Sequence, residues 1–273
     1  MPELPEVESL RRSMLDRVVG ARIEEVHVAR PDVVLDELER PIRDLVVGSL
    51  RRHGKLLAIV ESGDARTICV HLGMSGRLTI VEPWSPAERH EHVRFSLEAP
   101  NGARLDLAFV DPRRFGGISL HPTWSRAIEQ RIAAMGPDAL SIDPEALADR
   151  LAGRDRPIKS ALLDQGLVAG LGNIYVDEVL HLAGVRPSRR CRRVSRATLL
   201  KVARLVPMVL GGAIGAGGST LRDYRDASGR PGSAQTLHRV YGRSGRPCLG
   251  CGTTLRSRAV GGRSSCFCPS CQH

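Results

Sequence analysis

The sequence is poor in aromatic side chains and has no long apolar run. It contains two Trp, three Tyr and four Phe, 3% of all residues, so stacking platforms for nucleic-acid bases are scarce. No stretch approaches the about 20 continuous apolar residues of a membrane-spanning helix. The N-terminal sequence MPELPEVESLRR carries acids early and lacks the apolar core of a secretory signal. We therefore expect a protein of a reducing cytoplasm, with cysteines that do not form disulfides.

Acidic residues are also too few to balance the basic ones. Forty Lys and Arg face 30 Asp and Glu, which gives a formal net charge of +10. Such an excess predicts attraction to a polyanion, most commonly a phosphate backbone. Charge alone does not choose among DNA, RNA and an anionic membrane.

The order of sequence patterns predicts an α+β protein with two main domains and a small module. At 273 residues with 42% hydrophobic residues, the chain is long enough for two cores. One amphipathic helix runs through Val7, Leu10, Met14 and Val18 and ends at Gly20, and short alternating runs over 21–120 then predict an antiparallel β-sandwich or barrel. From residue 124 onward the periodicity is helical. The expected parts are an N-terminal domain at 1–124, a linker at 125–140, a helical domain at 141–240 and a cysteine module at 241–273.

Four cysteines near the C-terminus have the spacing of a structural zinc site. Cys248, Cys251, Cys268 and Cys271 form two Cys-x-x-Cys knuckles with sixteen residues between them. Four thiolates complete a closed tetrahedron around one Zn²⁺, which supplies folding energy to a segment too short for a core. Cys266 is interpreted as a spare thiol, because one intervening residue suits a knuckle turn poorly.

The sequence also predicts the environment of two further cysteines and the structure between the two knuckles. Cys69 lies in an apolar strand-like run and is expected to be buried, whereas Cys191 lies among arginines and is expected to be exposed. Between the knuckles, two alternating segments joined at Gly261-Gly262 predict a hairpin. Its projecting arginines would suit a nucleic-acid backbone; they are Arg256, Arg258 and Arg263.

Five motifs in register carry a resemblance to a known family. They are MPELPEVES at the start, HLGMSG at 71–76, DPRRFGG at 111–117, GLGNIYVDE at 170–178 and the two terminal knuckles. Together they resemble the formamidopyrimidine-DNA glycosylase family, bacterial base-excision enzymes for oxidised purines. The resemblance spans the chain. It implies a β-sandwich flanked by helices, a helical domain with a helix–two-turn–helix, and a β-hairpin zinc finger. It also implies an enzyme of the bacterial cytoplasm or nucleoid that acts on double-stranded DNA with oxidised bases or abasic sites. Nothing in the sequence suggests oligomerisation, so we expect a monomer.

The family implies covalent catalysis by the N-terminus. Removal of Met1 would leave Pro2 with a free secondary amine that attacks sugar C1′ and persists as an iminium (Schiff base). The resemblance gives Glu3 the acid–base role and Glu6 a supporting one. From the residues alone, Glu6 is equally well explained as an acid at a helix N-terminus, whereas Glu3 would lie at the mobile start of the chain. Lys55, which precedes a strand, matches the family lysine that reaches the lesion and its phosphate.

Other matched positions are expected to contact DNA. Met74, Arg113 and Phe115 match the residues that fill the gap left by an everted base, and Gly-flanked segments favour exposed loop tips for Met74 and Phe115. Asn173 and Arg263 match residues that hold phosphates. For His92 a phosphate contact is possible, although a solvated surface position is the safer expectation.

The sequence departs from the family pattern around the expected lesion loop. Ser233 and Ala234 stand where aromatic residues are common, Cys266 stands where another aromatic is common, and Arg222 stands where a lysine near the lesion is frequent. The altered loop leaves room for a related endonuclease VIII-like glycosylase for oxidised pyrimidines, whereas the intact HLGMSG and DPRRFG motifs favour the purine enzyme.

An alternative from another class is a non-catalytic zinc protein that binds damaged DNA. The presence of Pro2, Glu3 and Lys55 argues against it, because binding alone needs none of them.

Overall fold

The computed structural model describes residues 2–34 and 42–273, except for the side chains of residues 130 and 131. The chain forms two compact units. The first comprises residues 1–133 and 217–233, and the second comprises residues 134–216 and 234–273. Each unit is described by itself.

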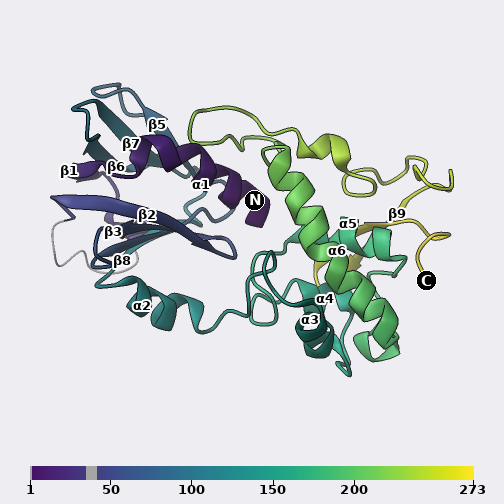
Figure 1. The fold of residues 1–273 in the computed structure, drawn as a ribbon. Coiled ribbons are helices and arrows are strands. Elements are labelled where there is room, and N and C mark those ends of the chain that lie inside the picture. The colour runs from purple at the N-terminus through teal and green to yellow at the C-terminus, as the bar shows by residue number, and fades with distance from the viewer. Residues whose placement is uncertain (1, 35–41) are drawn as a thin grey trace. The chain divides into compact units, whose positions relative to one another are not determined.

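The first unit begins with the helix α1 (Leu4–Val18), as the apolar periodicity predicted. Pro5 lies in its first turn, where a missing N–H costs nothing. Its buried face carries Val7, Leu10 and Met14, and the chain then turns at Gly20 with a φ of 87°. The helix packs on the strand β2 (Leu45–His53) (Figure 1).

An antiparallel β-sandwich follows α1 and confirms the expected architecture. The strands pair in the order β5-β7-β6-β1-β2-β3-β4-β8, and only two residue pairs join β1 to β2, so the sheet folds into two layers. A short turn, η1 (Pro31–Val33), follows β1. The remaining strands are β1 (Arg22–Val28), β3 (Leu56–Glu61), β4 (Thr67–His71), β5 (Arg77–Val81), β6 (Glu91–Glu98), β7 (Arg104–Val110) and β8 (Gly117–His121).

Alternation along the strands divides the apolar residues of the first unit between two cores. Leu57 and Ile59 of β3 join the main core, which also holds Phe95 and Phe109. The alternate residues of β3 form a smaller cluster with Cys69 and Trp124 on the other face. The helix α2 (Trp124–Ala127) and the following π-turn η2 (Ile128–Ile132) cover that face. Cys69 is buried there, as expected.

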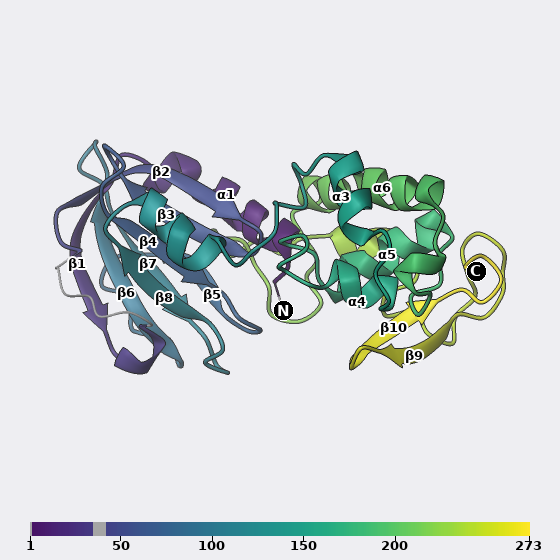
Figure 2. The same ribbon diagram turned by 90° about the horizontal axis from the view of Figure 1, so that it is seen from below.

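The second unit is helical and ends in a two-stranded hairpin (Figure 2). Polar residues start two of its helices: Asp143 caps α3 through the Ala146 N–H, and Ser195 caps α6 through the Thr198 N–H. Gly184 ends α5 in the left-handed conformation. The elements are α3 (Pro144–Leu151), α4 (Ile158–Leu162), α5 (Asn173–Ala183), η3 (Cys191–Arg193), α6 (Arg196–Gly215), η4 (Ala234–Leu237), β9 (Arg256–Val260) and β10 (Arg263–Phe267).

The helix α6 is long and apolar enough, by length and composition, to cross a membrane. This differs from the expectation based on continuous apolar runs, because α6 spreads its apolar residues around Pro207 and several glycines. Its buried residues, among them Leu199, Val202 and Leu210, pack against α3 and α5. It therefore serves as a core helix of the second unit.

Two features differ from the sequence-based expectations. Residues 217–233 belong to the first unit, although the expected helical domain at 141–240 included them. They bind α1 through the Ser219 N–H, which donates to Glu6, and the Ala227 N–H, which donates to Ser13. The expectation that Cys191 is exposed was wrong: its side chain is fully buried while its arginine neighbours point outward.

Candidate active site and nucleic-acid interface

Pro2 and Glu3 are buried at the start of α1. Glu3 is the N-cap of the helix and is only 2% exposed. Its backbone N–H donates to Glu6 Oε2 over 2.8 Å, which fixes the backbone directly after Pro2. The expectation that Glu3 lies at a mobile chain start was therefore wrong. Met1 lies outside the described residues, so its removal stays a prediction.

Glu6 joins the first turn of α1 to the 217–233 segment. Its Oε1 accepts the Ser219 N–H over 2.7 Å, while its backbone carbonyl accepts the Tyr224 hydroxyl over 2.9 Å. The side chain is 1% exposed. Glu6 is thus a helix N-terminal acid, as the local pattern allowed, and it also holds a distant loop beside Pro2 and Glu3.

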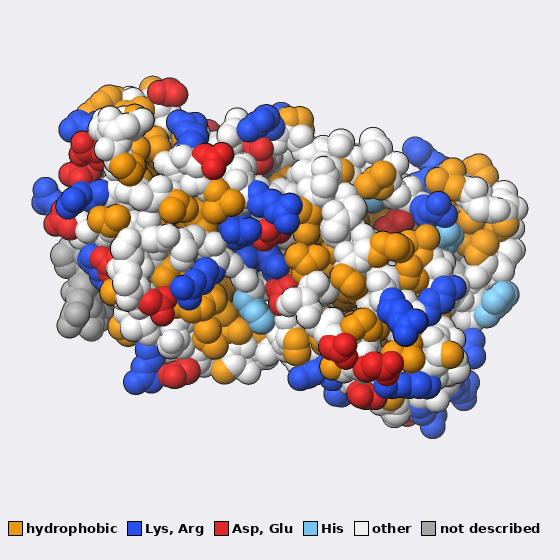
Figure 3. Space-filling model, viewed as in Figure 1, with side chains coloured by type: hydrophobic (Ala, Val, Ile, Leu, Met, Phe, Trp, Pro, Cys, Tyr) orange, Lys and Arg blue, Asp and Glu red, His pale blue; other side chains and the backbone are white. Residues whose placement is uncertain are grey.

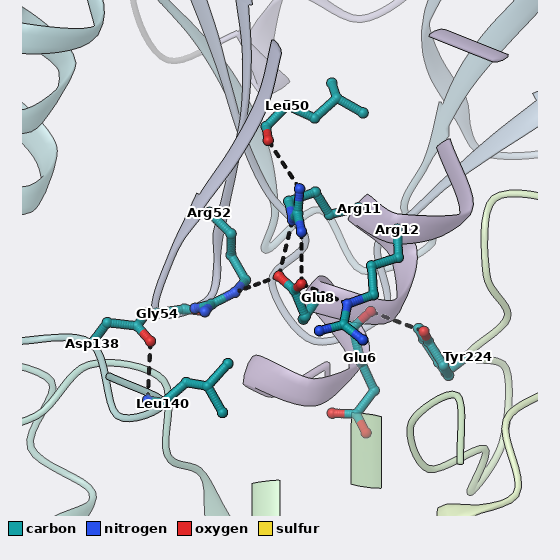
Figure 4. A network of polar contacts seen from close by, with 10 residues as sticks. All are labelled: Glu6, Glu8, Arg11, Arg12, Leu50, Arg52, Gly54, Asp138, Leu140 and Tyr224. Carbon is teal, nitrogen blue, oxygen red and sulfur yellow. Dashed lines mark hydrogen bonds and ion pairs between the residues drawn. The ribbon is translucent and has the colours of Figure 1, made fainter. Parts of the chain in front are cut away.

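A cluster around Glu8 connects α1 with the β2–β3 turn that carries Lys55 (Figure 4). The Glu8 carboxylate accepts hydrogen bonds from Arg11, Arg12 and Arg52, at 2.8–3.1 Å. Arg52 also donates to the Gly54 carbonyl over 2.9 Å. Burial raises the pKa of Glu8, but the three guanidinium groups outweigh burial and lower that pKa to about 2. Sequence reasoning missed this cluster; the Arg-Arg before His53 was its only signal.

Lys55 lies in the tight turn between β2 and β3, directly before β3, as its sequence position indicated. The Arg52–Gly54 hydrogen bond sets the backbone of this turn. Glu8, which binds Arg52, lies six residues after Pro2, a rise of about 9 Å along a helix. The cluster therefore ties the backbones that carry the candidate amine and the candidate lysine within one unit.

The loops that carry Met74 and Phe115 lie against each other. A Cβ on Gly73 would come within 2.3 Å of the Phe115 carbonyl carbon, so only glycine permits this approach. Met74 is 41% exposed and Phe115 56% exposed, which confirms the expectation of exposed tips. The guanidinium of Arg113 lies over the Phe115 ring, 4.9 Å from its centroid. The three residues predicted to fill the gap left by an everted base thus share one exposed surface.

A buried carboxylate, which sequence reasoning did not single out, shapes these loops. Asp111 is fully buried and accepts from the Ser75 hydroxyl over 2.6 Å and from the Gly116 N–H over 2.8 Å. It also accepts from the Arg113 N–H over 3.2 Å. One side chain therefore holds both of the loops that carry Met74 and Phe115.

His92 does not lie on a solvated surface, so that expectation was wrong. It is 5% exposed, and its Nε2 lies 2.8 Å from the Asp111 carbonyl oxygen. This contact holds the first residue of the DPRRFGG loop in place. His92 and Val93 are both buried at a register shift of β6 against β7, so the burial of His92 does not follow the alternation of the strand.

In the second unit, Asn173 begins α5 beside the zinc hairpin. Its Nδ2 donates to the Ser264 carbonyl over 3.0 Å, and Ser264 follows Arg263 directly in β10. Arg263 is exposed at the turn end of the hairpin, opposite Val260. The two predicted phosphate ligands are therefore neighbours, next to the helix N-terminus where backbone N–H groups favour an anion.

A buried ion pair fastens the hairpin to the helices. Lys159 of α4 donates to Asp177 Oδ1 over 2.7 Å and to the Ser264 carbonyl over 2.9 Å. Asp177 Oδ2 accepts the Cys266 N–H over 2.9 Å. Both side chains are at most 1% exposed. Burial raises the pKa of Asp177 to about 6, and the attraction of Lys159 offsets burial only in part.

The four predicted zinc ligands converge. All four Sγ atoms lie within 4.8 Å of one another, with Cys251 and Cys268 3.5 Å apart and Cys248 and Cys271 4.0 Å apart. Tetrahedral Zn–S bonds of about 2.3 Å place sulfurs about 3.8 Å apart, so the cluster fits one Zn²⁺. Backbone N–H groups of Gly250 and Cys271 point at sulfurs, as they do where thiolates bind a metal.

The 217–233 segment carries the predicted lesion-side residue Arg222. Its base closes where Gly232 lies against Gly217 and Gly218: a Cβ on Gly232 would lie 2.1 Å from the Gly218 carbonyl oxygen. Arg222 is exposed, next to Leu221, which is 48% exposed. Ser233 and Ala234 follow the closure, so small residues occupy this place.

Comparison with known proteins identifies the sequence pattern. Family models match residues 1–118 (formamidopyrimidine-DNA glycosylase N-terminal domain), 134–225 (the H2TH domain of the same family) and 245–273 (a zinc finger found in FPG and IleRS). Proteins named formamidopyrimidine-DNA glycosylase from Ruegeria pomeroyi and Gluconobacter oxydans are 42% and 43% identical, with both chains fully covered.

Solved structures agree with these relatives. A complex of Lactococcus lactis Fpg with DNA containing an abasic site has a TM-score of 0.91 at 32% identity, over all of both chains. A structure of MutM with DNA containing carbocyclic 8-oxo-G has a TM-score of 0.90 at 32% identity, again over all of both chains. The expected fold, with its sandwich, helix–two-turn–helix region and zinc hairpin, is confirmed.

Proposed function

Because the chain belongs to the formamidopyrimidine-DNA glycosylase family, we propose that it excises oxidised purines from duplex DNA and then cleaves the strand at the resulting abasic site. It is a bifunctional DNA glycosylase and AP lyase with one structural zinc ion. The observation that supports this best is the burial of Pro2 and Glu3 at the capped start of α1, in a chain whose related structures hold abasic and 8-oxo-G DNA.

In the proposed reaction, Pro2 supplies the nucleophile once Met1 has been removed. Its nitrogen lone pair forms a bond to sugar C1′, and the bond from C1′ to the base breaks with the electron pair leaving on the base. Opening of the sugar gives an iminium. Loss of a C2′ proton expels the 3′ phosphate, a second elimination expels the 5′ phosphate, and water then releases the amine.

Glu3 is proposed to move the protons of this sequence. It follows Pro2 directly, and a carboxyl there can protonate the sugar oxygen during opening and later accept a proton. Glu6 holds the backbone of Glu3 and so positions both residues. Lys55 is proposed to bind the phosphate beside the lesion, from a turn that the Glu8 cluster fixes.

The remaining matched residues are proposed to hold the opened duplex. Met74 and Phe115 fill the gap, and Arg113 bonds the orphaned base. Asn173 and Arg263 bind phosphate, and exposed Arg222 contacts DNA near the lesion. Buried His92 is assigned an indirect contribution through the Asp111 loop. The protein acts inside the cell, as a monomer in the bacterial cytoplasm or nucleoid.

A trapping experiment tests this function. The purified protein, with its N-terminal residue identified by mass spectrometry, is mixed with duplex DNA carrying 8-oxoguanine opposite cytosine and reduced with borohydride. We expect a covalent protein–DNA adduct that is lost in Pro2→Gly and Glu3→Gln. A matched control is Glu25→Gln, an exposed acid on β1, which should trap as the parent protein does.

Other outcomes overturn specific parts of the proposal. An adduct with an oxidised pyrimidine but none with 8-oxoguanine keeps the chemistry and replaces the substrate. No adduct with either lesion, in a protein that begins with Pro2 and still binds DNA, leaves a damaged-DNA-binding protein without catalysis.

A further inference from the structure

An arginine-rich segment between α5 and α6 lies outside the proposed lesion site. Five of the eight residues at 186–193 are arginine, and they are here called the arginine ridge: Arg186, Arg189, Arg190, Arg192 and Arg193. All but Arg186 belong to the most exposed class of residues, and Arg186 is half-buried. All of the ridge arginines except Arg192 line a hollow of about 380 Å³, which Ser188 and His273 also line.

The backbone of the ridge is held rigidly. Cys191 is buried and its N–H donates to the Arg156 carbonyl, while the Arg192 N–H donates to the Arg154 carbonyl, both over 3.0 Å. The Ile158 N–H donates to the Arg189 carbonyl over 2.8 Å. The guanidinium groups are therefore displayed from a fixed turn, which lowers the ordering cost of binding a ligand.

Few acids neutralise the ridge. Arg190 and Arg192 share one carboxylate, that of Asp155, at 2.7 Å each. Arg189 donates to the Arg193 carbonyl, and Arg186 donates to the carbonyls of Pro269 and Gln272. Within the part of the chain that the structure describes, no ion pair to a side-chain carboxylate is formed by Arg186, Arg189 or Arg193. Five arginines therefore face one paired side-chain carboxylate among the described residues, which leaves an excess of positive charge.

Some exposed arginines outside the ridge are paired with acids. Arg196, three residues beyond the ridge, binds both Glu145 and Asp149. On the face drawn in Figure 3, blue and red side chains lie next to one another at several places. Paired arginines of this kind are the ordinary condition of a solvated surface. Within the ridge only Arg190 and Arg192 meet that condition, through Asp155.

The ridge lies at the opposite end of the zinc hairpin from the candidate phosphate site. The guanidinium of Arg186 lies 5.9 Å from the centroid of the Phe267 ring, at the last residue of β10, whereas Arg263 is its first residue. Four strand steps separate these two residues, about 14 Å. A duplex with one charge for about every 1.7 Å of axis offers further phosphates over such a distance.

From this placement we propose that the arginine ridge is a second DNA-backbone surface, which binds phosphates outside the lesion site and strengthens sequence-independent binding. The identity of the polyanion rests on the proposed function, since that function supplies duplex DNA as the ligand. The ridge contributes affinity for undamaged DNA and is not needed for the chemistry at C1′. It gives the protein a means of staying on DNA between lesions.

The test compares two double variants of equal charge. Arg189→Ser with Arg193→Ser removes two ridge arginines that lack carboxylate partners among the described residues. The control, Arg30→Ser with Arg196→Ser, removes two exposed arginines that are paired with acids. Both lower the net charge by two. Binding to undamaged duplex DNA is measured by fluorescence anisotropy over a series of salt concentrations, and thermal unfolding confirms that each variant is folded.

We expect the ridge variant to bind undamaged duplex DNA about tenfold more weakly at about 0.1 M salt. The slope of log K against log salt should fall by about 2, because each lost phosphate contact removes about 0.9. Single-turnover excision at saturating protein should be unchanged. The control should keep the parent slope.

Several results overturn the proposal. An unchanged slope in the ridge variant does so, and so does an equal loss in both variants, which would report only net charge. Loss of single-turnover excision in a folded ridge variant would place these residues in the lesion site. Weaker binding of a poly-glutamate peptide with unchanged DNA binding would assign the ridge to an acidic protein. If the parent protein traps no lesion while the ridge variant alone loses DNA binding, the proposed function fails and the ridge proposal stands.

Discussion

Two buried carboxylates, one in each unit, hold functional elements together by different electrostatic balances. Glu8 in the first unit meets three guanidinium groups and has its pKa lowered to about 2. Asp177 in the second unit meets one ammonium group and a backbone N–H, and burial raises its pKa to about 6. The number of cations around a carboxylate, set against the water it loses, decides which way its pKa moves.

The difference also separates two ways of building a site. Around Glu8, charged side chains link α1 to a strand turn, and Arg12 remains more than half exposed to water. Around Asp177, a dry ion pair joins two helices to a hairpin whose other support is zinc. If one partner of the Asp177 pair is lost, fewer other groups can pair with the remaining charge. Substitutions there should therefore cost more stability than substitutions around Glu8.

Removal of the metal should have the largest effect. Replacement of Cys268 by Ser breaks the closed tetrahedron, and the 247–273 segment has too small a core to fold without zinc. We expect loss of the bound zinc, measured by atomic absorption, and loss of duplex binding. The matched control is Cys266→Ala, which removes the thiol that lies outside the cluster and should keep one zinc per chain. Equal zinc loss in both variants would contradict the ligand set.

Breaking the dry ion pair should come next. Lys159→Met leaves Asp177 buried without its ammonium partner, and Asp177→Asn leaves Lys159 charged in a fully buried place. Loss of one partner of a buried pair costs about 3–5 kcal/mol, so the free energy of unfolding in urea should fall by that order for Asp177→Asn. Lys159→Met should cost less, because a carboxyl with a raised pKa takes up a proton more readily. A larger loss for Lys159→Met would refute this asymmetry.

The Glu8 cluster should tolerate change better. Glu8→Gln keeps the shape but removes the charge that three arginines share, and hydrogen bonds to charged groups contribute about 1.5–3 kcal/mol. We expect a loss of unfolding free energy of that size. Borohydride trapping should slow as well, since the turn that carries Lys55 loses its anchor. The exposed acid Glu25 again provides the control, and unchanged trapping would show that the cluster is structural only.

The smallest expected effect is a change of folding stability at acidic pH. The folded pKa of Glu8 lies near 2, below its ordinary value of 4.5, so the stability it contributes is complete above that ordinary value and is lost as pH falls toward 2. Asp177 has the opposite sign: with a folded pKa near 6, its ionisation lowers stability as pH rises from 3.8 to 6. The Glu8→Gln variant should therefore lie closer to the parent in stability at pH 3 than at pH 6. A constant difference would count against the lowered pKa.

Local sequence patterns predicted the elements and much of the candidate site. Apolar spacing indicated α1, alternation indicated the strands, and the knuckle spacing indicated the cysteine cluster that the structure shows. Gly-flanked motifs indicated that Met74 and Phe115 are exposed. Each of these signals lies within a few residues of what it predicts.

Long-range contacts could not be read in the same way. Glu8 and Arg52 are hydrogen-bonded across 44 residues of sequence, and Lys159 and the Ser264 carbonyl across 105. The burial of His92 and Cys191 depends on the segments that pack against them in three dimensions. It could not be predicted from their neighbours in sequence or from their charge. Only the three-dimensional pairing assigns Asp111 its role between two loops.

The attachment of residues 217–233 to the first unit has a consequence for biosynthesis. The ribosome completes residues 1–133 long before it adds Ser219 and Ala227, whose N–H groups bind Glu6 and Ser13 of α1. The nascent N-terminal unit must therefore wait for more than 80 further residues (134–216) before its first helix can gain these bonds. A fragment that stops at residue 133 lacks them permanently, so the enzyme's N-terminus is completed only after most of the chain has been made.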